Sequence, residues 1–196
     1  MPSPSVVRAF IGIDLPPEIQ RCLEQVTTQL RQRLEGVPVR WVPAEKIHIT
    51  LKFLGDVSVA NIDMLKKIMK SVAPAHQAFE ISVGGLGAFP KPHDPRVIWV
   101  GLEIPPELVV VRHGIETEAA RLGYTQEERP FSPHLTLGRV SRNASTSDIH
   151  KNANVLETYK VGFLGAVRVE AIHLYRSDLK PGGAIYTRLF SVPFGV

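Results

Sequence analysis

The sequence predicts an α+β fold built from two similar halves. Segments with alternating apolar residues, as in half-buried strands, are interspersed with segments whose apolar residues recur every three or four positions, as in amphipathic helices. Two motifs also occur twice. His-apolar-Thr-Leu begins at residues 48 and 134, 86 positions apart, and Pro-Pro-Glu begins at residues 16 and 105, 89 positions apart. Because two unrelated motifs repeat at nearly the same spacing, we infer that half of the chain has been duplicated.

Four elements are predicted in the first half. The alternating segments 6–13 and 47–54 are strands, and the second contains the first His-x-Thr. Residues 16–34 form a helix, because proline is tolerated in a first turn and an amphipathic stripe follows. The apolar residues of that stripe are Ile19, Leu23, Val26, Leu30 and Leu34. Ser58 can cap a second helix that ends near residue 72.

The second half repeats this order. Strands are predicted over residues 79–83 and 96–103, separated by the turn-rich segment 84–95. A helix over 105–122 begins at the second Pro-Pro-Glu and is ended by Gly123. The second His-x-Thr strand includes residues 135–139.

The C-terminal part is predicted to contain a short helix and a hairpin. The helix covers 146–153, and the strands of the hairpin cover 168–176 and 184–192, joined by a loop through 181–183. No low-complexity linker interrupts the chain. We therefore expect residues 1–196 to form one domain with two lobes.

The repeated motif indicates acid–base chemistry on an anion. Side chains alternate along a strand, so His48 and Thr50 should face one way, and His134 and Thr136 should do the same in the second half. An imidazole titrates near pH 6.5, so of two facing one pocket, one can accept a proton while the other donates one. A threonine hydroxyl can donate a hydrogen bond to a phosphate oxygen. One such motif alone would be an ordinary half-buried strand; two together predict a phosphate-sized site.

Composition limits the other classes of function. The 196 residues are 44% hydrophobic and 21% charged, as in ordinary globular proteins, and the net charge of +4 mildly favours a polyanionic partner. The single cysteine, Cys22, excludes an internal disulfide framework. No apolar run reaches the roughly 18 residues of a membrane span, and the N-terminus lacks the features of a signal peptide. We expect a cytoplasmic protein that binds no membrane. The ligand spacings of zinc sites are also missing, so we expect no metal.

Four segments resemble the two-histidine (2H) phosphoesterase superfamily, and in particular its RNA 2′,3′-cyclic phosphodiesterases, also called 2′-5′ RNA ligases. They are RAFIGIDLP at 8–16, HITLKFLG at 48–55, RPFSPHLTLGR at 129–139 and LYRS at 174–177. The resemblance implies a bilobal fold with pseudo-twofold symmetry, each lobe having a small, mainly antiparallel sheet with helices outside and an active-site cleft between the sheets. It also implies metal-free hydrolysis of ribose 2′,3′-cyclic phosphate to a 2′-phosphate and a reversible, ATP-independent 2′-5′ joining activity.

The resemblance also assigns roles to particular residues. It implies that His48 protonates the leaving O3′ and His134 activates water, although the sequence alone does not orient these two roles. Thr50 and Thr136 would bind phosphate oxygens.

Two further residues stand five positions after their histidine. The resemblance implies that Arg139 binds the phosphate and that Phe53 stacks on a base. From the residues alone, Arg139 could also be a solvated charge at a strand end, and Phe53 could also be a core side chain. Lys52, two positions after Thr50 on an alternating strand, could add to the anion site.

The expected partner is RNA ending in a 2′,3′-cyclic phosphate, tRNA fragments among them, bound by a monomer that needs no cofactor. Two alternatives stay open. One keeps the site but changes the substrate to a small cyclic nucleotide or a 2′-5′ oligonucleotide. The other is an RNA-binding module without catalysis, which would have no need of two titrating histidines.

Overall fold

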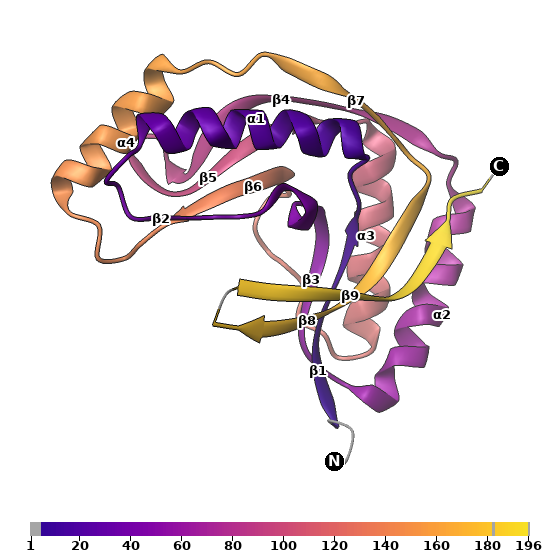
Figure 1. The fold of residues 1–196 in the computed structure, drawn as a ribbon. Helices are drawn as coiled ribbons and strands as arrows, with labels where there is room; N and C mark the ends of the chain where they lie inside the picture. Colours follow the sequence, from indigo (N-terminus) through magenta and orange to yellow (C-terminus); the bar gives the residue numbers. More distant parts are fainter. Residues whose placement is uncertain (1–4, 182, 196) are drawn as a thin grey trace.

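Two antiparallel sheets and four α-helices make up the computed structural model, which describes residues 5–181 and 183–195 (Figure 1). Its strands are β1 (Val6–Ile13), β2 (Val39–Trp41), β3 (Ile49–Ser58), β4 (Phe79–Lys91), β5 (Asp94–Glu103), β6 (His134–Val140), β7 (Phe163–Val169), β8 (Ala171–Lys180) and β9 (Gly183–Pro193). Its α-helices are α1 (Pro17–Arg33), α2 (Ile62–Val72), α3 (Pro106–Arg121) and α4 (Thr146–Thr158).

The strand order of the two sheets confirms the predicted α+β fold of two similar halves. One sheet has the order β3-β1-β8-β9, and the other has the order β2-β6-β5-β4-β7. In each sheet the His-x-Thr strand, β3 or β6, pairs with the strand that precedes Pro-Pro-Glu, β1 or β5. The five-stranded sheet differs by the added edge strand β2, which pairs with β6.

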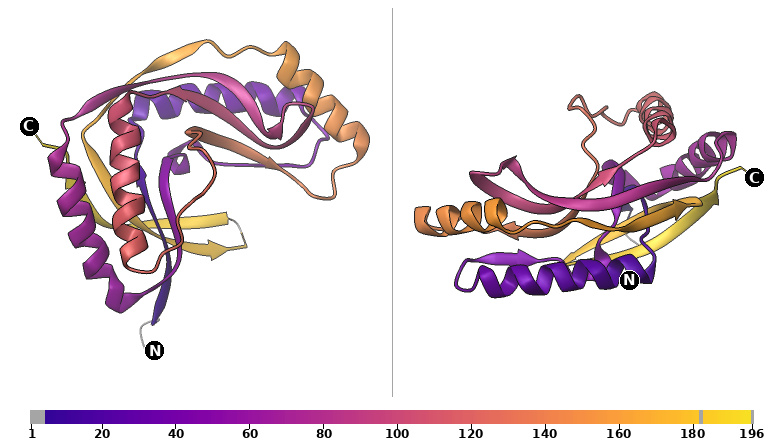
Figure 2. Two further views of the ribbon diagram at one scale, coloured as in Figure 1. Left: turned by 180° about the vertical axis from the view of Figure 1, so that it is seen from behind. Right: turned by 90° about the horizontal axis from the view of Figure 1, so that it is seen from above.

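The helix after each Pro-Pro-Glu crosses to the other half's sheet. Helix α1 follows β1 but contacts β7, while α3 follows β5 but contacts β3. Seen from above, α1 and α3 lie on opposite sides of the molecule with the strands between them (Figure 2). The predicted stripe of α1 is buried in a core that continues through both halves. Because each half lends a helix to the other, we propose that residues 1–196 fold as a single bilobal domain.

All four predicted helices are confirmed, with shifts at their ends. Helices α1 and α3 lie within the predicted ranges 16–34 and 105–122. Helix α2 begins at Ile62, after a 3₁₀ turn at Val59–Asn61, and Ser58 makes no capping hydrogen bond. Helix α4 runs to Thr158, five residues beyond the predicted end at 153. In the described part of the chain, no helix is long and apolar enough to cross a membrane.

The prediction that residues 84–95 form turns between two short strands is wrong. Most of these residues belong to the strands of the long hairpin β4–β5. Gly85, at φ +74°, interrupts the pairing between Gly84 and Leu86 as a bulge rather than ending the strand. A Cβ on Gly87 would lie 2.3 Å from the ring of Trp99, so this glycine permits close packing between the strands.

The C-terminal hairpin is confirmed as β8–β9, with a different start. The predicted strand 168–176 is divided, because β7 ends at Val169 in one sheet and β8 begins at Ala171 in the other. Of the predicted loop 181–183, Gly182 lies outside the described residues. Strand β2 was not predicted; it has only three residues, between two prolines.

Candidate active site

The two motif histidines are held in the same way by the backbone. His48 immediately precedes β3 and His134 begins β6. The Nδ1 atom of His48 lies 2.9 Å from the carbonyl oxygen of Lys46, and that of His134 lies 2.9 Å from the carbonyl oxygen of Ser132. A carbonyl oxygen only accepts hydrogen bonds, so Nδ1 carries the hydrogen in both rings. In the neutral ring, Nε2 is therefore the free base.

Aromatic rings fix the planes of both imidazoles. Phe10 stacks on His48 with ring centroids 4.5 Å apart, and Tyr186 meets the same ring edge-on at 5.0 Å. Phe89 meets His134 edge-on at 4.9 Å. These contacts restrain the orientation of both rings.

A β-bulge interrupts strand β3 directly after the first motif threonine. The partner of Gly12 on β1 is Thr50, but the partner of Ile11 is Lys52 rather than Leu51. Leu51 is therefore the extra residue. Beyond a bulge, the alternation of side chains between the two faces of a strand is reversed.

Strand β6 carries the same device at the equivalent position. Trp99 on β5 pairs with Thr136, and Ile98 pairs with Gly138, which leaves Leu137 as the extra residue. Both bulges thus fall on the leucine of His-x-Thr-Leu.

We call the face of β3 that bears Thr50, and the face of β6 that bears Thr136, the site faces. The bulges determine which residues after each threonine point to the site face. Strict alternation would turn a residue five positions after a histidine to the opposite face. With the bulge, Phe53 pairs with Phe10, the ring that stacks on His48, and its side chain is 69% exposed. The prediction that Phe53 could be a core side chain is therefore wrong.

Arg139 is likewise on the site face of β6. It is exposed. Burial lowers the pKa of His134, and the positive charge of Arg139 adds to that effect; burial raises the pKa of Tyr186, and the same charge opposes that rise. Tyr186 belongs to the four-stranded sheet and touches His48. Arg139 therefore lies near side chains of both sheets, His134 of the five-stranded sheet and Tyr186 of the four-stranded sheet. Strands β3 and β6 also contact each other, so the two His-x-Thr strands are neighbours in space.

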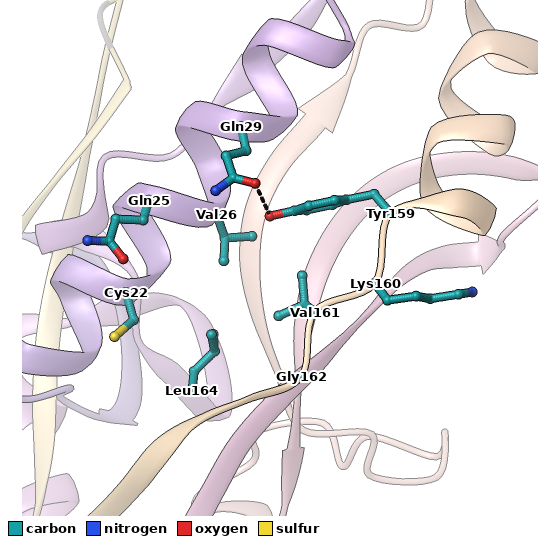
Figure 3. A pocket seen from close by; sticks show the side chains of 9 residues that line it. All are labelled: Cys22, Gln25, Val26, Gln29, Tyr159, Lys160, Val161, Gly162 and Leu164. Carbon is teal, nitrogen blue, oxygen red and sulfur yellow. Dashed lines mark hydrogen bonds between the residues drawn. The ribbon is translucent and has the colours of Figure 1, made fainter.

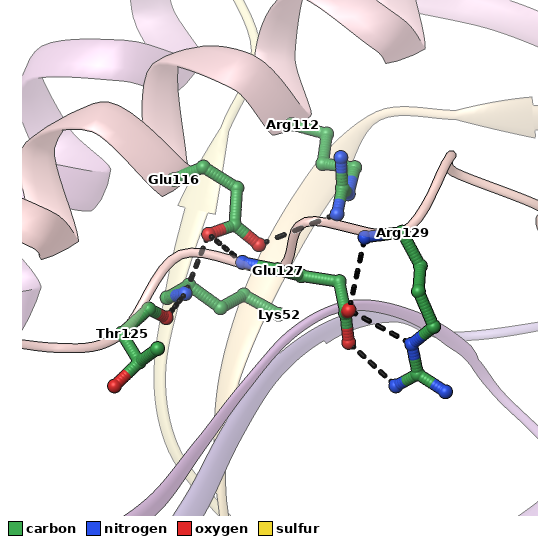
Figure 4. A network of polar contacts seen from close by, with 6 residues as sticks. All are labelled: Lys52, Arg112, Glu116, Thr125, Glu127 and Arg129. Carbon is green, nitrogen blue, oxygen red and sulfur yellow. Dashed lines mark hydrogen bonds and ion pairs between the residues drawn. The ribbon is translucent and has the colours of Figure 1, made fainter.

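The hypothesis that Lys52 adds to the anion site is wrong, because the bulge turns it into the core. Its Nζ donates to Glu116 Oε2 at 2.6 Å and to the carbonyl oxygen of Thr125 at 2.9 Å (Figure 4). The Lys52 and Glu116 side chains are only 2% and 6% exposed. Glu116 also accepts from the backbone N–H of Glu127 at 3.4 Å and pairs with Arg112 at 3.4 Å. The network ties strand β3 to the segment that leads into His134.

The surroundings of the two histidines differ in charge. Burial lowers the pKa of both imidazoles below the usual 6.5, while each carbonyl hydrogen bond opposes this effect. The negative charge of Asp14 raises the pKa of His48, whereas the positive charge of Arg139 lowers that of His134. Asp14 is held in place because it accepts hydrogen bonds from Tyr175 and Arg188.

The structure adds residues that the motifs did not indicate. Phe10 and Asp14 lie in the opening segment that carried the resemblance, but no spacing linked them to a histidine. Tyr186 comes from the C-terminal hairpin and Arg40 from the unpredicted strand β2. Alternation within the hairpin could have placed Tyr186 on one face, but only the folded sheet shows that this face meets His48.

A separate hollow of about 240 Å³ lies away from the motif strands (Figure 3). Helix α1 contributes Cys22, Gln25, Val26 and Gln29. The other wall is the segment 159–162 between α4 and β7, together with Leu164 of β7. Neither β3 nor β6 contributes to it. Within residues 5–181 and 183–195, no cluster of three or more His, Cys, Asp or Glu side chains has the arrangement of a metal site.

Two sheets that each present one His-x-Thr strand define the class of two-histidine phosphoesterases. The family model of LigT-like phosphoesterases matches this sequence over residues 13–99 and 102–186, and each segment contains one motif histidine. The chain belongs to the LigT-like phosphoesterase family.

Individual relatives resemble the chain over nearly its whole length. An RNA 2′,3′-cyclic phosphodiesterase of Methanothermobacter thermautotrophicus is 32% identical over 92% of this chain and 95% of its own. Its counterpart in Escherichia coli K12 is 31% identical over 93% of both chains. Among solved structures, E. coli LigT complexed with 3′-AMP has a TM-score of 0.75 at 27% identity, covering 96% of this chain and 98% of its own. A protein of Thermus thermophilus has a TM-score of 0.79 at 26% identity, with 95% and 97% covered.

Proposed function

We propose that this chain hydrolyses RNA 2′,3′-cyclic phosphate ends to 2′-phosphates by acid–base catalysis with His48 and His134. The observation that carries the proposal is the matched pair of imidazoles, each with Nδ1 on a carbonyl oxygen and with no hydrogen bond to Nε2 from the residues that the structure describes. Relatives named RNA 2′,3′-cyclic phosphodiesterases support the choice of substrate.

The reaction needs one proton removed and one supplied. Nε2 of one neutral histidine takes a proton from water as the water oxygen attacks phosphorus. The bond between phosphorus and O3′ breaks, and Nε2–H of the other, charged histidine protonates O3′. The bond to O2′ remains, so the product is a 2′-phosphomonoester with a free 3′-hydroxyl.

The remaining site-face groups suit the phosphate. The hydroxyls of Thr50 and Thr136 can each donate a hydrogen bond to a nonbridging oxygen, and Arg139 supplies a planar fork of donors and a positive charge. Stabilising the negative charge that builds up on these oxygens is the largest electrostatic contribution expected of the site.

The same groups would also join RNA ends. If the 5′-hydroxyl of an RNA replaces water, proton removal from that hydroxyl and protonation of O3′ form a 2′-5′ phosphodiester. Its energy comes from the cyclic phosphate, so no ATP is consumed.

The charges around the site favour one assignment of roles. Asp14 favours the charged form of His48, and Arg139 favours the neutral form of His134. A general acid must begin charged and a general base neutral. We therefore assign proton donation to O3′ to His48 and activation of water to His134.

Kinetics with a small set of substrates tests the proposal against its alternatives. Rates would be measured with a dinucleotide 2′,3′-cyclic phosphate, ADP-ribose 1″,2″-cyclic phosphate and a 2′-5′ dinucleotide, alongside binding of the first. The proposal expects the highest kcat/KM on the RNA end. Faster turnover of either other substrate would replace the assigned substrate, and binding without turnover would indicate an RNA-binding module.

The pH dependence of kcat/KM should be bell-shaped, with its maximum below pH 6.5. Both histidines of the free enzyme have pKa values lowered by burial, and the active form has one of them charged. As the pH rises through these values the acid is lost, and as it falls through them the base is protonated. Initial rates over pH 4–9 at low substrate would check this. A maximum above pH 7 would contradict the inferred environment.

Phe53 and Arg139 should separate base recognition from phosphate recognition. Phe53→Ala removes a stacking contact worth about 1–3 kcal/mol per base, and should slow nucleotide substrates but spare methyl riboside 2′,3′-cyclic phosphate, which has no base. Arg139→Gln should weaken both substrates alike, by the roughly 1.5–3 kcal/mol of hydrogen bonds to a charged group. The measurement is kcat/KM for both variants on both substrates.

Two exposed residues provide matched controls for this comparison. Phe163, 73% exposed on β7, controls for loss of an exposed phenylalanine, and Arg142, exposed after β6, controls for loss of an arginine charge. Equal losses on both substrates in a folded Phe53→Ala variant would rule out base stacking.

A further inference from the structure

Strand β2 places a second arginine directly beside Arg139. In the register of β2 against β6, Arg40 is the partner of Arg139. Partners across an antiparallel pair project to the same face, with Cβ atoms about 4.5–5.5 Å apart. The two guanidinium groups therefore arise side by side on one face of the five-stranded sheet.

Packing on the other face of the sheet independently fixes the direction of Arg40. A Cβ added to Gly138 would lie 2.8 Å from Val39 and 2.9 Å from Trp41, so these two side chains cover Gly138. Arg40 lies between them in the strand and must project to the opposite face, the site face. The positive charges of both Arg40 and Arg139 act on Tyr186, which touches His48.

This pair of positive charges has no acidic counterpart. Within residues 5–181 and 183–195, no Asp or Glu forms an ion pair with Arg40 or Arg139, although eleven ion pairs, one of them formed by a histidine, occur elsewhere. Like charges directly opposite each other destabilise a strand pair. An anionic ligand that lies against both residues would remove this repulsion.

We propose that Arg40 forms a second phosphate subsite, which binds the phosphodiester on the 5′ side of the nucleotide bearing the cyclic phosphate. The inference rests on the proposed function. Suppose that Arg139 binds the cyclic phosphate. The next phosphate along the RNA is the phosphodiester on the 5′ side of the same terminal nucleotide, and Arg40, the neighbour of Arg139, is placed to bind it. A nucleoside 2′,3′-cyclic phosphate lacks this group, so the chain should prefer RNA ends to mononucleotides.

The subsite also gives the site a direction. Strand β2 extends the five-stranded sheet beyond β6, whereas β3 is the edge of the four-stranded sheet and has no added neighbour. The exposed Phe53 lies on that second sheet. The RNA backbone would therefore run along the five-stranded sheet, while the terminal base lies toward the four-stranded one.

The test compares a dinucleotide 2′,3′-cyclic phosphate with the same molecule carrying a neutral methylphosphonate linkage. For wild type, kcat/KM should be about tenfold higher with the charged linkage, the effect expected of one charge-assisted hydrogen bond. In Arg40→Gln this ratio should fall to about one. Arg142→Gln removes an exposed arginine outside the pair and should keep the wild-type ratio.

The outcomes separate this inference from the proposed function. An Arg40→Gln variant that keeps the tenfold ratio, or a wild type that does not distinguish the two linkages, would overturn the subsite. If wild type hydrolyses neither molecule, the proposed function fails, and the same ratio is then measured from equilibrium dissociation constants. A charge preference in binding that Arg40→Gln abolishes would still support the subsite, and a preference that it leaves unchanged would overturn it.

Discussion

Replacing either motif histidine with alanine should lower kcat/KM by about 10²–10⁴-fold, the usual loss when a general acid or base is removed. Each imidazole is held by a carbonyl oxygen at 2.9 Å and by at least one aromatic ring, so its Nε2 is oriented before substrate arrives. No other histidine follows the His-x-Thr pattern. Steady-state kinetics of His48→Ala and His134→Ala would measure the loss.

The double replacement is the sharper part of this prediction. Once one proton transfer is lost, the other can no longer be concerted with it, so the combined loss should be far less than the product of the single losses. The exposed His113 on α3 provides the matched control, and His113→Ala should keep full activity. Melting curves would show that the variants are folded. Near-normal hydrolysis by a folded single variant would contradict the mechanism.

Replacing Lys52 with methionine should destabilise the fold by about 3–5 kcal/mol, because it leaves the buried carboxylate of Glu116 without its closest positive partner. Arg112, at 3.4 Å, compensates only in part. The change also removes the bond from Lys52 to Thr125, so the segment entering His134 should loosen and activity should fall. Urea unfolding gives the change in the free energy of unfolding.

A double variant and a surface control distinguish the buried charge from a general loss of packing. Lys52→Met combined with Glu116→Leu removes both charges and should recover much of the stability. Lys66→Met breaks a similar pair with Asp63 at 2.9 Å, but Asp63 is 82% exposed and the pair is screened by water, so a much smaller loss than that of Lys52→Met is expected. Equal destabilisation by Lys52→Met and Lys66→Met would mean that burial of the ion pair has no special weight.

The duplicated fold could be predicted because local signals agree with it. Both Pro-Pro-Glu motifs follow a strand and start a helix. The apolar residues of α1, spaced three or four positions apart, form one face of the helix, and this face is buried. His-x-Thr likewise needs only the alternation of a strand. The exchange of helices between the halves has no local signal, since it depends on which sheet each helix finally covers.

What the sequence did not reveal depends on small departures from regular strands. The bulges at Leu51 and Leu137 bring Phe53 and Arg139 to the site faces and turn Lys52 into the core, but leucine has no preference that marks a bulge. Glycines that normally indicate turns instead permit the hairpin β4–β5 to bend and pack on Trp99. Strand β2 is too short for any period, so Arg40 became visible only through its pairing with Arg139.

The most direct test of paired-histidine phosphodiester hydrolysis is to identify the product of a dinucleotide 2′,3′-cyclic phosphate by phosphorus NMR in excess EDTA. Two imidazoles supply both proton transfers, so turnover should continue under these conditions. Because O3′ is the oxygen that leaves, the sole product should be the 2′-phosphomonoester. A 3′-phosphomonoester, or loss of turnover in EDTA with recovery on added metal, would contradict the account.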